Sequence, residues 1–207
     1  MSQSLFELIE RYSKEQMDKL GLYGWPHVQR VLRLCLKIAE LEGGRVDLEV
    51  LKVAALLHDI AKHIQRINPS INHGAAGAEM AEAFLEKCGF PKSKIKAVCH
   101  AIRAHTHVEE PVSVEAKILH DADFLDKLGA VGIATIFVKA CLTNRTIEEI
   151  LESFFSEEQE LYVIKHLKWI KKPHLYTKTA KIIAEKRNKI AFMFFDQLRK
   201  EINLEDF

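Results

Sequence analysis

The chain has 207 residues, and its 30 Lys and Arg residues against 29 Asp and Glu residues give a formal net charge of +1. This balance provides no broad positive field that would hold a nucleic acid polymer or an anionic membrane surface. Hydrophobic residues make up 48% of the chain, which is typical of a globular protein, and no apolar run has the length of a transmembrane helix. The N-terminal residues lack the pattern of a secretory signal, so we expect a cytoplasmic protein.

The content of cysteine, glycine and proline favours a reduced, helical protein. Cys35, Cys88, Cys99 and Cys141 form no Cys-x-x-Cys pair and lie within apolar helical patterns, so we expect reduced thiols in the core. The 9 glycines and 5 prolines supply few of the turn residues that a many-stranded protein requires.

Apolar residues recur at helical spacing along nearly the whole chain, which predicts an all-α fold in one continuous domain. Asp47 is placed to cap one helix, Gly89 to end another in a left-handed conformation, and Thr146 with Glu149 to form a capping box. The helices are expected over about residues 5–20, 27–41, a stretch from Asp47 through His58, 74–88, 93–105, a stretch after Ser113 that ends near Gly129, a short stretch to Cys141, then 146–171 and 177–202. In the last helix we expect Ile183, Ile190, Phe194 and Leu198 to face the core.

The most informative motif is an adjacent imidazole and carboxylate, His58-Asp59, inside the apolar run that begins at Val53. Burying both groups without a partner would cost several kcal/mol, so hydrogen bonds, a counter-charge or a cation must accompany them. A divalent ion resolves this cost directly, and imidazole with carboxylate suits Mn, Fe, Co, Ni or Zn. A hydrogen-bonded pair without a metal is the alternative that the dipeptide alone leaves open.

The surrounding residues make the cation more probable than the simple pair. His27 begins a helix upstream, and Asp123 lies in a second apolar helix downstream. With Trp25-Pro26-His27, His58-Asp59 and Asp121-Ala122-Asp123-Phe124-Leu125, the sequence resembles the HD-domain superfamily of metal-dependent phosphohydrolases, in particular the small stand-alone HD hydrolases. The resemblance implies a helical bundle over residues 1–207, with a metal-site core at about 25–130 and C-terminal helices at about 147–205 that pack on it.

The resemblance also implies the metal ligands, which are His27, His58, Asp59 and Asp123. Asp123 is preferred to Asp121 because the metal-binding carboxylate of the superfamily directly precedes an x-Leu pair, which is Phe124-Leu125 in this chain. Asp121 and Asp126 are left open as orienting partners or solvated acids. Many relatives have Arg where this chain has Phe124, and this departure concerns the substrate more than the metal.

Some members of the superfamily use further histidines to hold a second metal ion. Helical geometry allows His105 to look into the site, whereas His100 and His107 are expected to face solvent. His73 is a second candidate ligand, with an exposed position at the start of a helix as its alternative.

Several cations are candidates for contact with a phosphorylated substrate. Lys62 follows His58 by one helical turn, so its ammonium could reach a phosphate oxygen, and a surface lysine is the alternative. Arg103, Lys127 and Arg187 are weaker candidates of the same kind. Asp59 and Lys62 are the expected catalytic residues: Asp59 would orient or deprotonate a water, and Lys62 would offset the charge on the phosphoryl oxygens.

The resulting expectation is a metal-dependent phosphohydrolase whose divalent ion is Mn, Co, Ni, Fe, Mg or Zn. The implied substrate is a small phosphate ester or anhydride, first of all a nucleoside triphosphate cleaved to monophosphate and pyrophosphate. Two alternatives remain open: a phosphomonoesterase or phosphodiesterase with the same metal site, and a helical module that binds a nucleotide or protein without turnover. Neither a nucleic acid polymer nor a membrane is an expected partner.

Overall fold

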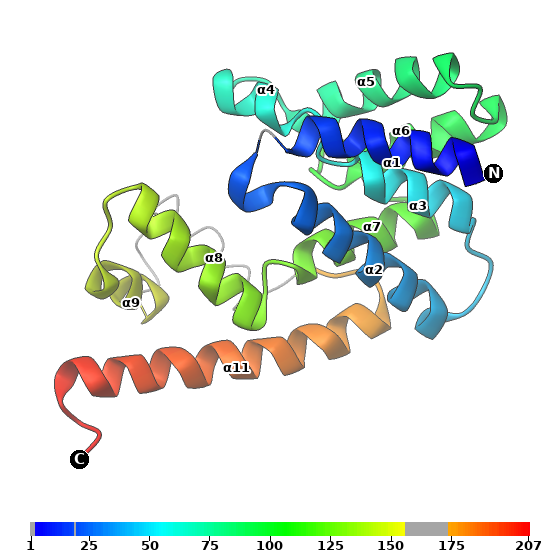
Figure 1. The fold of residues 1–207 in the computed structure, drawn as a ribbon. Coiled ribbons are helices and arrows are strands. Elements are labelled where there is room, and N and C mark those ends of the chain that lie inside the picture. The colour runs from blue at the N-terminus through cyan, green and yellow to red at the C-terminus, as the bar shows by residue number, and fades with distance from the viewer. Residues whose placement is uncertain (1–2, 19, 156–173) are drawn as a thin grey trace. The chain divides into compact units, whose positions relative to one another are not determined.

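A computed structural model describes residues 3–18, 20–155 and 174–207, and every regular element in these ranges is a helix (Figure 1). The predicted all-α fold class is thereby confirmed. The helices are α1 (Gln3–Met17), the 3-10 helix η1 (Gly21–Tyr23), α2 (Trp25–Glu42), α3 (Leu48–Leu57), α4 (Lys62–Ile67), α5 (His73–Lys87), α6 (Lys92–Ala104), α7 (Val114–Leu125), α8 (Gly129–Leu142), α9 (Ile147–Phe155) and α11 (Lys178–Asn203).

The chain divides into two compact units. The first comprises Met1–Asp123 with Tyr176–Thr179, and the second comprises Phe124–Leu175 with Ala180–Phe207. All four predicted metal ligands belong to the first unit. The expectation that residues 1–207 act as one domain, with the C-terminal helices packed on the metal-site core, stays a prediction.

The short helix α3 forms the centre of the first unit, where it contacts α1, α2 and α6 (Figure 1). Its residues Val53, Ala54, Ala55, Leu56 and Leu57 are all fully buried. A helix that is apolar on every side needs neighbours all around it, and this requirement explains its central place. Because α3 ends inside the core, the polar residues that follow it also begin in the interior.

The local signals read from the sequence act as expected. The carboxylate of Asp47 accepts hydrogen bonds from the backbone N–H groups of Glu49 and Val50 at the start of α3. Gly89 ends α5 with a φ of 76°, and Thr146 and Glu149 exchange the two hydrogen bonds of a capping box. Asn72 caps α5 in the same way as Asp47 caps α3.

The structure differs from the sequence-based expectation in two places, at α4 and in the last helix. The helix α4 was not predicted, because its six residues are too short for a periodic pattern. The helix predicted from residue 146 to about 171 begins as α9 (Ile147–Phe155), and its remainder stays a prediction because residues 156–173 lie outside the described ranges. The predicted core face of the last helix is wrong, since Ile190 is 51% and Phe194 is 40% exposed. The buried residues of α11 are Ala180, Ala184, Ala191 and Phe195.

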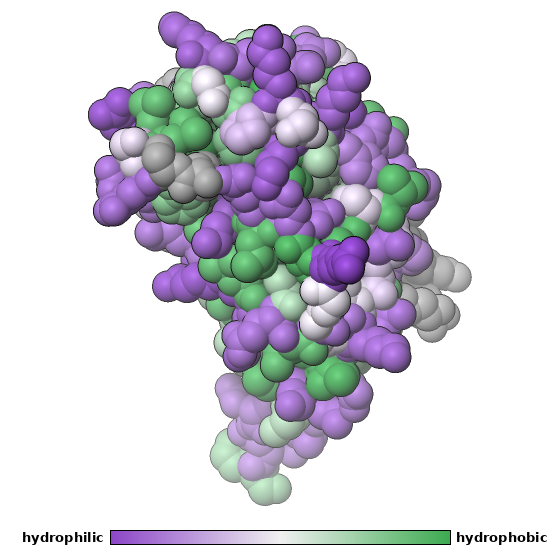
Figure 2. All heavy atoms as spheres, turned by 90° about the vertical axis from the view of Figure 1, so that its right-hand side faces the viewer, coloured by the Kyte–Doolittle hydropathy of each residue, from purple (hydrophilic) through white to green (hydrophobic). Residues whose placement is uncertain are grey.

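The cysteines are free, and two of them depart from the expected burial. Cys35 and Cys99 are buried, Cys88 is half-buried and Cys141 is exposed. On the face shown in Figure 2, hydrophilic side chains predominate and smaller groups of hydrophobic ones lie between them. Within the described ranges, no helix combines the length and the apolar character that crossing a membrane requires.

Candidate metal centre

The candidate ligands lie where helices begin or end in the interior of the first unit. His27 is in the first turn of α2, which starts after Gly24 and carries Pro26 in that turn. His58 is the C-terminal cap of α3, and Asp59 follows it in the turn before α4. Asp123 lies in the last turn of α7. His27, His58, Asp59 and Asp123 are all at most 5% exposed.

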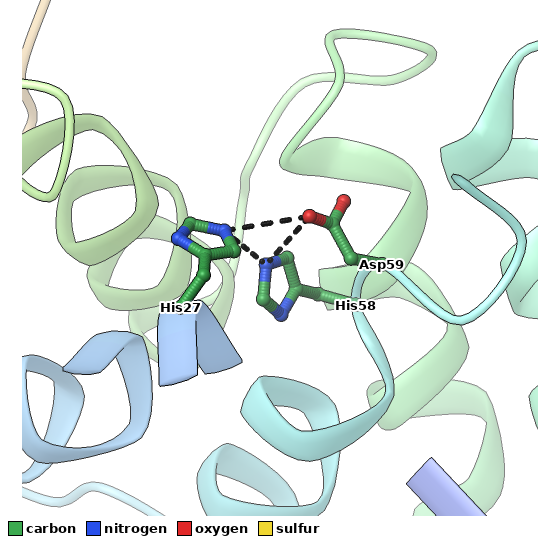
Figure 3. Close-up of side chains that lie close together, drawn as sticks. All are labelled: His27, His58 and Asp59. Carbon is green, nitrogen blue, oxygen red and sulfur yellow. Dashed lines mark hydrogen bonds and ion pairs between the residues drawn. The ribbon is translucent and has the colours of Figure 1, made fainter. Parts of the chain in front are cut away.

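These four side chains converge on a common point, as the sequence predicts. Nε2 of His27 lies 3.4 Å from Nε2 of His58 and 3.4 Å from Oδ2 of Asp59 (Figure 3). Nε2 of His58 lies 3.5 Å from the same Asp59 oxygen. Asp123 completes the group, because its Oδ1 is 3.3 Å from Nε2 of His27 and 4.0 Å from Nε2 of His58.

A second group of ligand atoms faces the other oxygen of Asp59. Nε2 of His73 lies 3.1 Å from Asp59 Oδ1, and Nε2 of His105 lies 3.6 Å from the same atom. The imidazoles of His58 and His105 pack edge to face, with their centres 5.1 Å apart. The Asp59 carboxylate therefore separates two clusters, with Oδ2 turned to the first and Oδ1 turned to the second.

Hydrogen bonds at the far side of the rings orient three of the histidines. Nδ1 of His58 lies 2.8 Å from the carbonyl oxygen of Ala55, and Nδ1 of His105 lies 2.5 Å from that of Ile102. Nδ1 of His73 lies 2.5 Å from the side-chain oxygen of Gln65. An Nδ1–H that donates to oxygen leaves the Nε2 lone pair directed at the site, which is the usual arrangement of a metal-binding imidazole.

Burial and charge set the protonation of this site. Burial lowers the pKa of His58 to about 3, and the negative charge of Asp59 only partly offsets this effect. Burial acts to raise the pKa of Asp59, but the neighbouring Lys62 and His58 outweigh it and hold the pKa well below its ordinary value. At neutral pH His58 is thus a neutral imidazole and Asp59 an ionised carboxylate, the forms that bind a metal ion.

The donor set fits a divalent cation. Neighbouring donor atoms lie 3.3–3.5 Å apart in the first cluster, which matches the spacing of nitrogen and oxygen ligands around one ion at about 2.0–2.2 Å. Nε2 of His105 is buried and has no hydrogen-bond partner among the described residues, so a cation would satisfy it. His27, His58 and Asp59 form one group with metal-binding spacing, and Asp59, His73 and His105 form another.

His100 and His107 fall outside the two clusters, whereas His73 belongs to the second one. His107 is exposed, as expected. His100 is only partly exposed, with 19% of its side chain accessible, and its Nδ1 lies 2.6 Å from a Glu109 carboxylate oxygen. His73, for which an exposed position was the alternative, has 16% of its side chain accessible and faces Asp59.

Lys62 is the predicted cation that the structure places at the site. Its ammonium donates a hydrogen bond to Oδ2 of Asp59. Arg103 is instead paired with Glu109, with Nε 3.1 Å from the carboxylate. Lys127 and Arg187 belong to the second unit, where the Arg187 guanidinium donates to the carbonyl of Leu125.

The structure resolves the open question about Asp121, which is fully buried. Its carboxylate accepts hydrogen bonds from the backbone N–H groups of Tyr176 and Thr177 and from the Thr177 hydroxyl. Asp121 thus holds the segment that precedes α11 against α7. Asp126 is also buried, with 4% exposure, so neither residue is a solvated acid.

Sequence reasoning missed two residues near the ligands. The ring of Tyr23 packs edge to face on the His27 imidazole, with the ring centres 5.5 Å apart. His120, in α7, is 2% exposed and contacts both Asp121 and His107. Tyr23 ends η1 and His27 lies in α2, so helical spacing could not indicate their contact. No sequence signal indicated the position of His120.

An all-helical unit that gathers two His–Asp clusters around one carboxylate has the site of a metal-dependent HD protein, and the family comparison agrees. The HD domain model matches residues 24–128, which include His27, His58, Asp59 and Asp123. The chain therefore belongs to the HD domain family, as its resemblance to HD phosphohydrolases predicts.

Particular relatives share most of the chain's length. The uncharacterized protein YpgQ of Bacillus subtilis is 30% identical over 192 residues, which are 89% of this chain and 87% of YpgQ. The crystal structure of YpgQ in complex with ADP has a TM-score of 0.70 at 26% identity and covers 96% of this chain and 95% of its own. The crystal structure of an HD-superfamily hydrolase from Bacillus thuringiensis has a TM-score of 0.72 at 28% identity. The match covers 97% of this chain and 98% of the hydrolase chain.

A longer protein matches part of this chain. Ribonuclease Y of Cutibacterium acnes is 33% identical over 132 residues. The match spans 61% of this chain but 23% of Ribonuclease Y. The similarity is thus limited to one part of that protein.

Proposed function

We propose that this chain is a metal-dependent phosphohydrolase that acts on a nucleotide and cleaves a nucleoside triphosphate to monophosphate and pyrophosphate. The observation that carries the proposal is the convergence of His27, His58 and Asp59, whose nearest donor atoms lie 3.4–3.5 Å apart. Asp123 adds an oxygen that lies 3.3 Å from Nε2 of His27 and 4.0 Å from Nε2 of His58. Buried imidazoles and carboxylates at this spacing are costly without a cation and well suited to one.

His27, His58, Asp59 and Asp123 would hold the ion, and His73 and His105 would hold a second ion on the other side of Asp59. A divalent ion in this position polarises a phosphoryl oxygen and increases the acidity of a water molecule. With only the first ion bound, Oδ1 of Asp59 would be open to accept a hydrogen bond from the attacking water, and it would orient this water or take up its proton.

Lys62 supplies positive charge for the phosphoryl oxygens. With 17% of its side chain accessible, it is the predicted substrate-binding cation that reaches the clusters from the solvent side. Its ammonium now pairs with Asp59. When a cation takes over Asp59, the ammonium can turn to a phosphate oxygen, where a compact charge with three donors offsets the negative charge that develops during cleavage.

The nucleotide is proposed on the strength of a relative. YpgQ, which resembles this chain over nearly its whole length, has been crystallised in complex with ADP. A site that accepts a nucleoside diphosphate is consistent with nucleotide substrates or products. In this chain, Lys62 and the candidate metal ligands would bind the phosphate groups of such a substrate.

The test measures bound metal and turnover together. The purified chain is incubated with Mn²⁺, Co²⁺ or Ni²⁺ and a panel of nucleoside triphosphates, and phosphate and pyrophosphate are measured separately. We expect pyrophosphate release that falls at least a hundredfold in Asp59→Ala, together with a loss of bound metal, because Asp59 contributes to both clusters. Asp18→Asn, an exposed carboxylate of the first unit, is the control. Unchanged metal content and turnover in Asp59→Ala would contradict the proposal.

A second candidate is a phosphodiesterase with the same metal site. The similarity to Ribonuclease Y, which matches 61% of this chain at 33% identity, favours it. The nucleotide panel is therefore extended by a short single-stranded RNA and by a simple phosphomonoester. Cleavage of the RNA with no release from triphosphates would favour the phosphodiesterase. Metal-free protein that stays inert on every substrate would favour a binding module.

A further inference from the structure

A pair of histidines outside the two clusters has the geometry of a second kind of metal site. His107 lies in the loop after α6 and His120 lies in α7, and their Nε2 atoms are 3.3 Å apart. Their rings are inclined by 68° with centres 4.8 Å apart. The two rings therefore do not stack. Their Nε2 atoms face each other and share a hydrogen bond, and a metal ion between them would take the place of its proton.

The spacing of these nitrogens matches a tetrahedral metal. Two imidazole nitrogens bound to one Zn²⁺ at about 2.0–2.1 Å lie roughly 3.3 Å apart when the angle at the metal is tetrahedral. We propose that His107 and His120 bind a zinc-class transition-metal ion at a site separate from the Asp59 clusters.

A carboxylate at the far side of His120 supports the proposal. Oδ1 of Asp121 lies 3.2 Å from Nδ1 of His120. A carboxylate that accepts the Nδ1–H of a histidine fixes the tautomer in which the Nε2 lone pair is available, and this arrangement recurs behind metal-binding histidines. His120 is 2% exposed, so its ring is held in this orientation by the surrounding protein.

The backbone of His107 gives a second, independent indication. Its φ is 59°, a left-handed conformation that residues other than glycine adopt infrequently. The side chain is nevertheless directed to His120, although the residue is exposed on the surface. An exposed histidine in this backbone conformation, aimed at a buried one, provides a ligand that an ion from solvent can reach.

An aromatic ring covers the buried member of the pair. The ring of Tyr176 packs edge to face on His120 with the centres 5.0 Å apart. The exposed side of the pair, at His107, is open to solvent. Water would fill the remaining positions of a four-coordinate ion. Such an ion would connect the loop after α6 to α7, the helix that carries Asp123.

The test uses Zn²⁺ alone as the probe and separates the new site from the Asp59 clusters. Zinc binding is measured by equilibrium dialysis for the full chain, for Asp59→Asn, and for Asp59→Asn with His107→Asn. Asparagine tolerates the left-handed backbone and removes the imidazole. His100→Asn in the Asp59→Asn background is the matched control, because His100 lies in the same region but pairs with Glu109.

We expect His107→Asn to remove one zinc equivalent from the Asp59→Asn protein or to weaken its binding at least tenfold, and His100→Asn to leave it unchanged. Anomalous diffraction at the zinc edge should show a peak between the two Nε2 atoms in crystals of the unmodified chain soaked with Zn²⁺. Equal zinc binding with and without His107, or the absence of that peak, would overturn the proposal. Neither result depends on whether the chain hydrolyses nucleotides.

Discussion

The ammonium nitrogen of Lys62 lies 4.7 Å from the centre of the Tyr23 ring. The same ring packs on the imidazole of His27, and the same ammonium pairs with Asp59. Tyr23 is 8% exposed. Its ring therefore makes two contacts: it packs edge to face on His27, a candidate metal ligand, and its face lies under the ammonium of Lys62, the candidate phosphate-binding cation. A cation over the face of an aromatic ring gains electrostatic stabilisation.

We expect Tyr23→Leu to lower kcat by roughly 2- to 30-fold, which corresponds to the stabilisation of about 0.5–2 kcal/mol that a cation over a ring provides. The reason is that Lys62 would lose the surface that positions its ammonium. Tyr23→Phe keeps the ring and should retain most of the activity. Steady-state kinetics of both variants check this expectation, and equal losses in the two would show that the ring face does not position Lys62.

The charge of Lys62 can be tested separately from its length. We expect Lys62→Met to lower kcat by about ten- to a hundredfold and Lys62→Arg to lower it less, because an ammonium on phosphoryl oxygens acts mainly in the transition state. Both variants should retain the metal content of the unmodified chain, since Lys62 is not a ligand. A larger change in KM than in kcat would indicate that Lys62 serves only ground-state binding.

Removal of the metal should lower thermal stability. A cation that binds only the folded state raises stability by about 2.7 kcal/mol at a concentration one hundred times its Kd. We therefore expect Mn²⁺ to raise the Tm and a chelator to reverse the rise. The rise should disappear in His58→Gln and persist in Asp196→Asn, an exposed carboxylate of α11. Differential scanning fluorimetry checks all three proteins, and an equal rise in His58→Gln would contradict the assigned ligand.

Two glycines of α5 differ sharply in the space around them. A Cβ at Gly74 would overlap the hydroxyl of Thr106, which donates to the Asn72 cap of the same helix. A Cβ at Gly77 would meet its nearest atoms at 3.6 Å, an ordinary contact. We expect Gly74→Ala to destabilise the chain by about 1–3 kcal/mol and Gly77→Ala to be neutral or stabilising by about 0.5–1 kcal/mol.

Urea denaturation of the two glycine variants measures the difference. Thr106→Ala, combined with Gly74→Ala, should recover part of the lost stability, since it removes the group with which the new methyl collides. If Gly74→Ala is as stable as the unmodified chain, the close approach of α5 to Thr106 is wrong.

The cap of α3 links stability to pH. Burial acts to raise the pKa of Asp47, but Lys94 and the N–H groups of Val50 and Glu49 outweigh it and lower the pKa from its ordinary value of 3.8. A carboxyl group with a lowered pKa in the folded state stabilises it above the ordinary value, and this contribution is lost as the pH falls through the lowered pKa. Asp47→Ala should cost about 1 kcal/mol at pH 7.

Asp47→Asn is the matched variant, because asparagine caps a helix as well as aspartate but has no charge. It should lose less stability than Asp47→Ala at pH 7, and its stability should depend less on pH below 4. Denaturation curves at pH 3 and pH 7 provide the measurement. The same pH dependence in all three proteins would show that the cap does not titrate as described.

The helical fold and the residues of the first His–Asp cluster could be predicted from the chain because their signals are local or carried by motifs. Asp47, Gly89 and the Thr146 capping box act on backbone groups within a few residues, so their effect does not depend on distant contacts. His58-Asp59 stands out because two polar groups interrupt an apolar run, and burial of that run makes a compensating partner necessary.

The exposed face of α11 and the second cluster depended on long-range packing. Helical periodicity places Ile190 and Phe194 on an apolar stripe of α11. It does not specify which of two adjacent stripes packs against the rest of the protein. The structure buries the stripe that contains Ala184 and Ala191. His73 and His105 reach the same oxygen of Asp59 from different helices. His107 and His120, thirteen residues apart, meet only because a loop folds back on α7, and no periodic pattern encodes such a meeting.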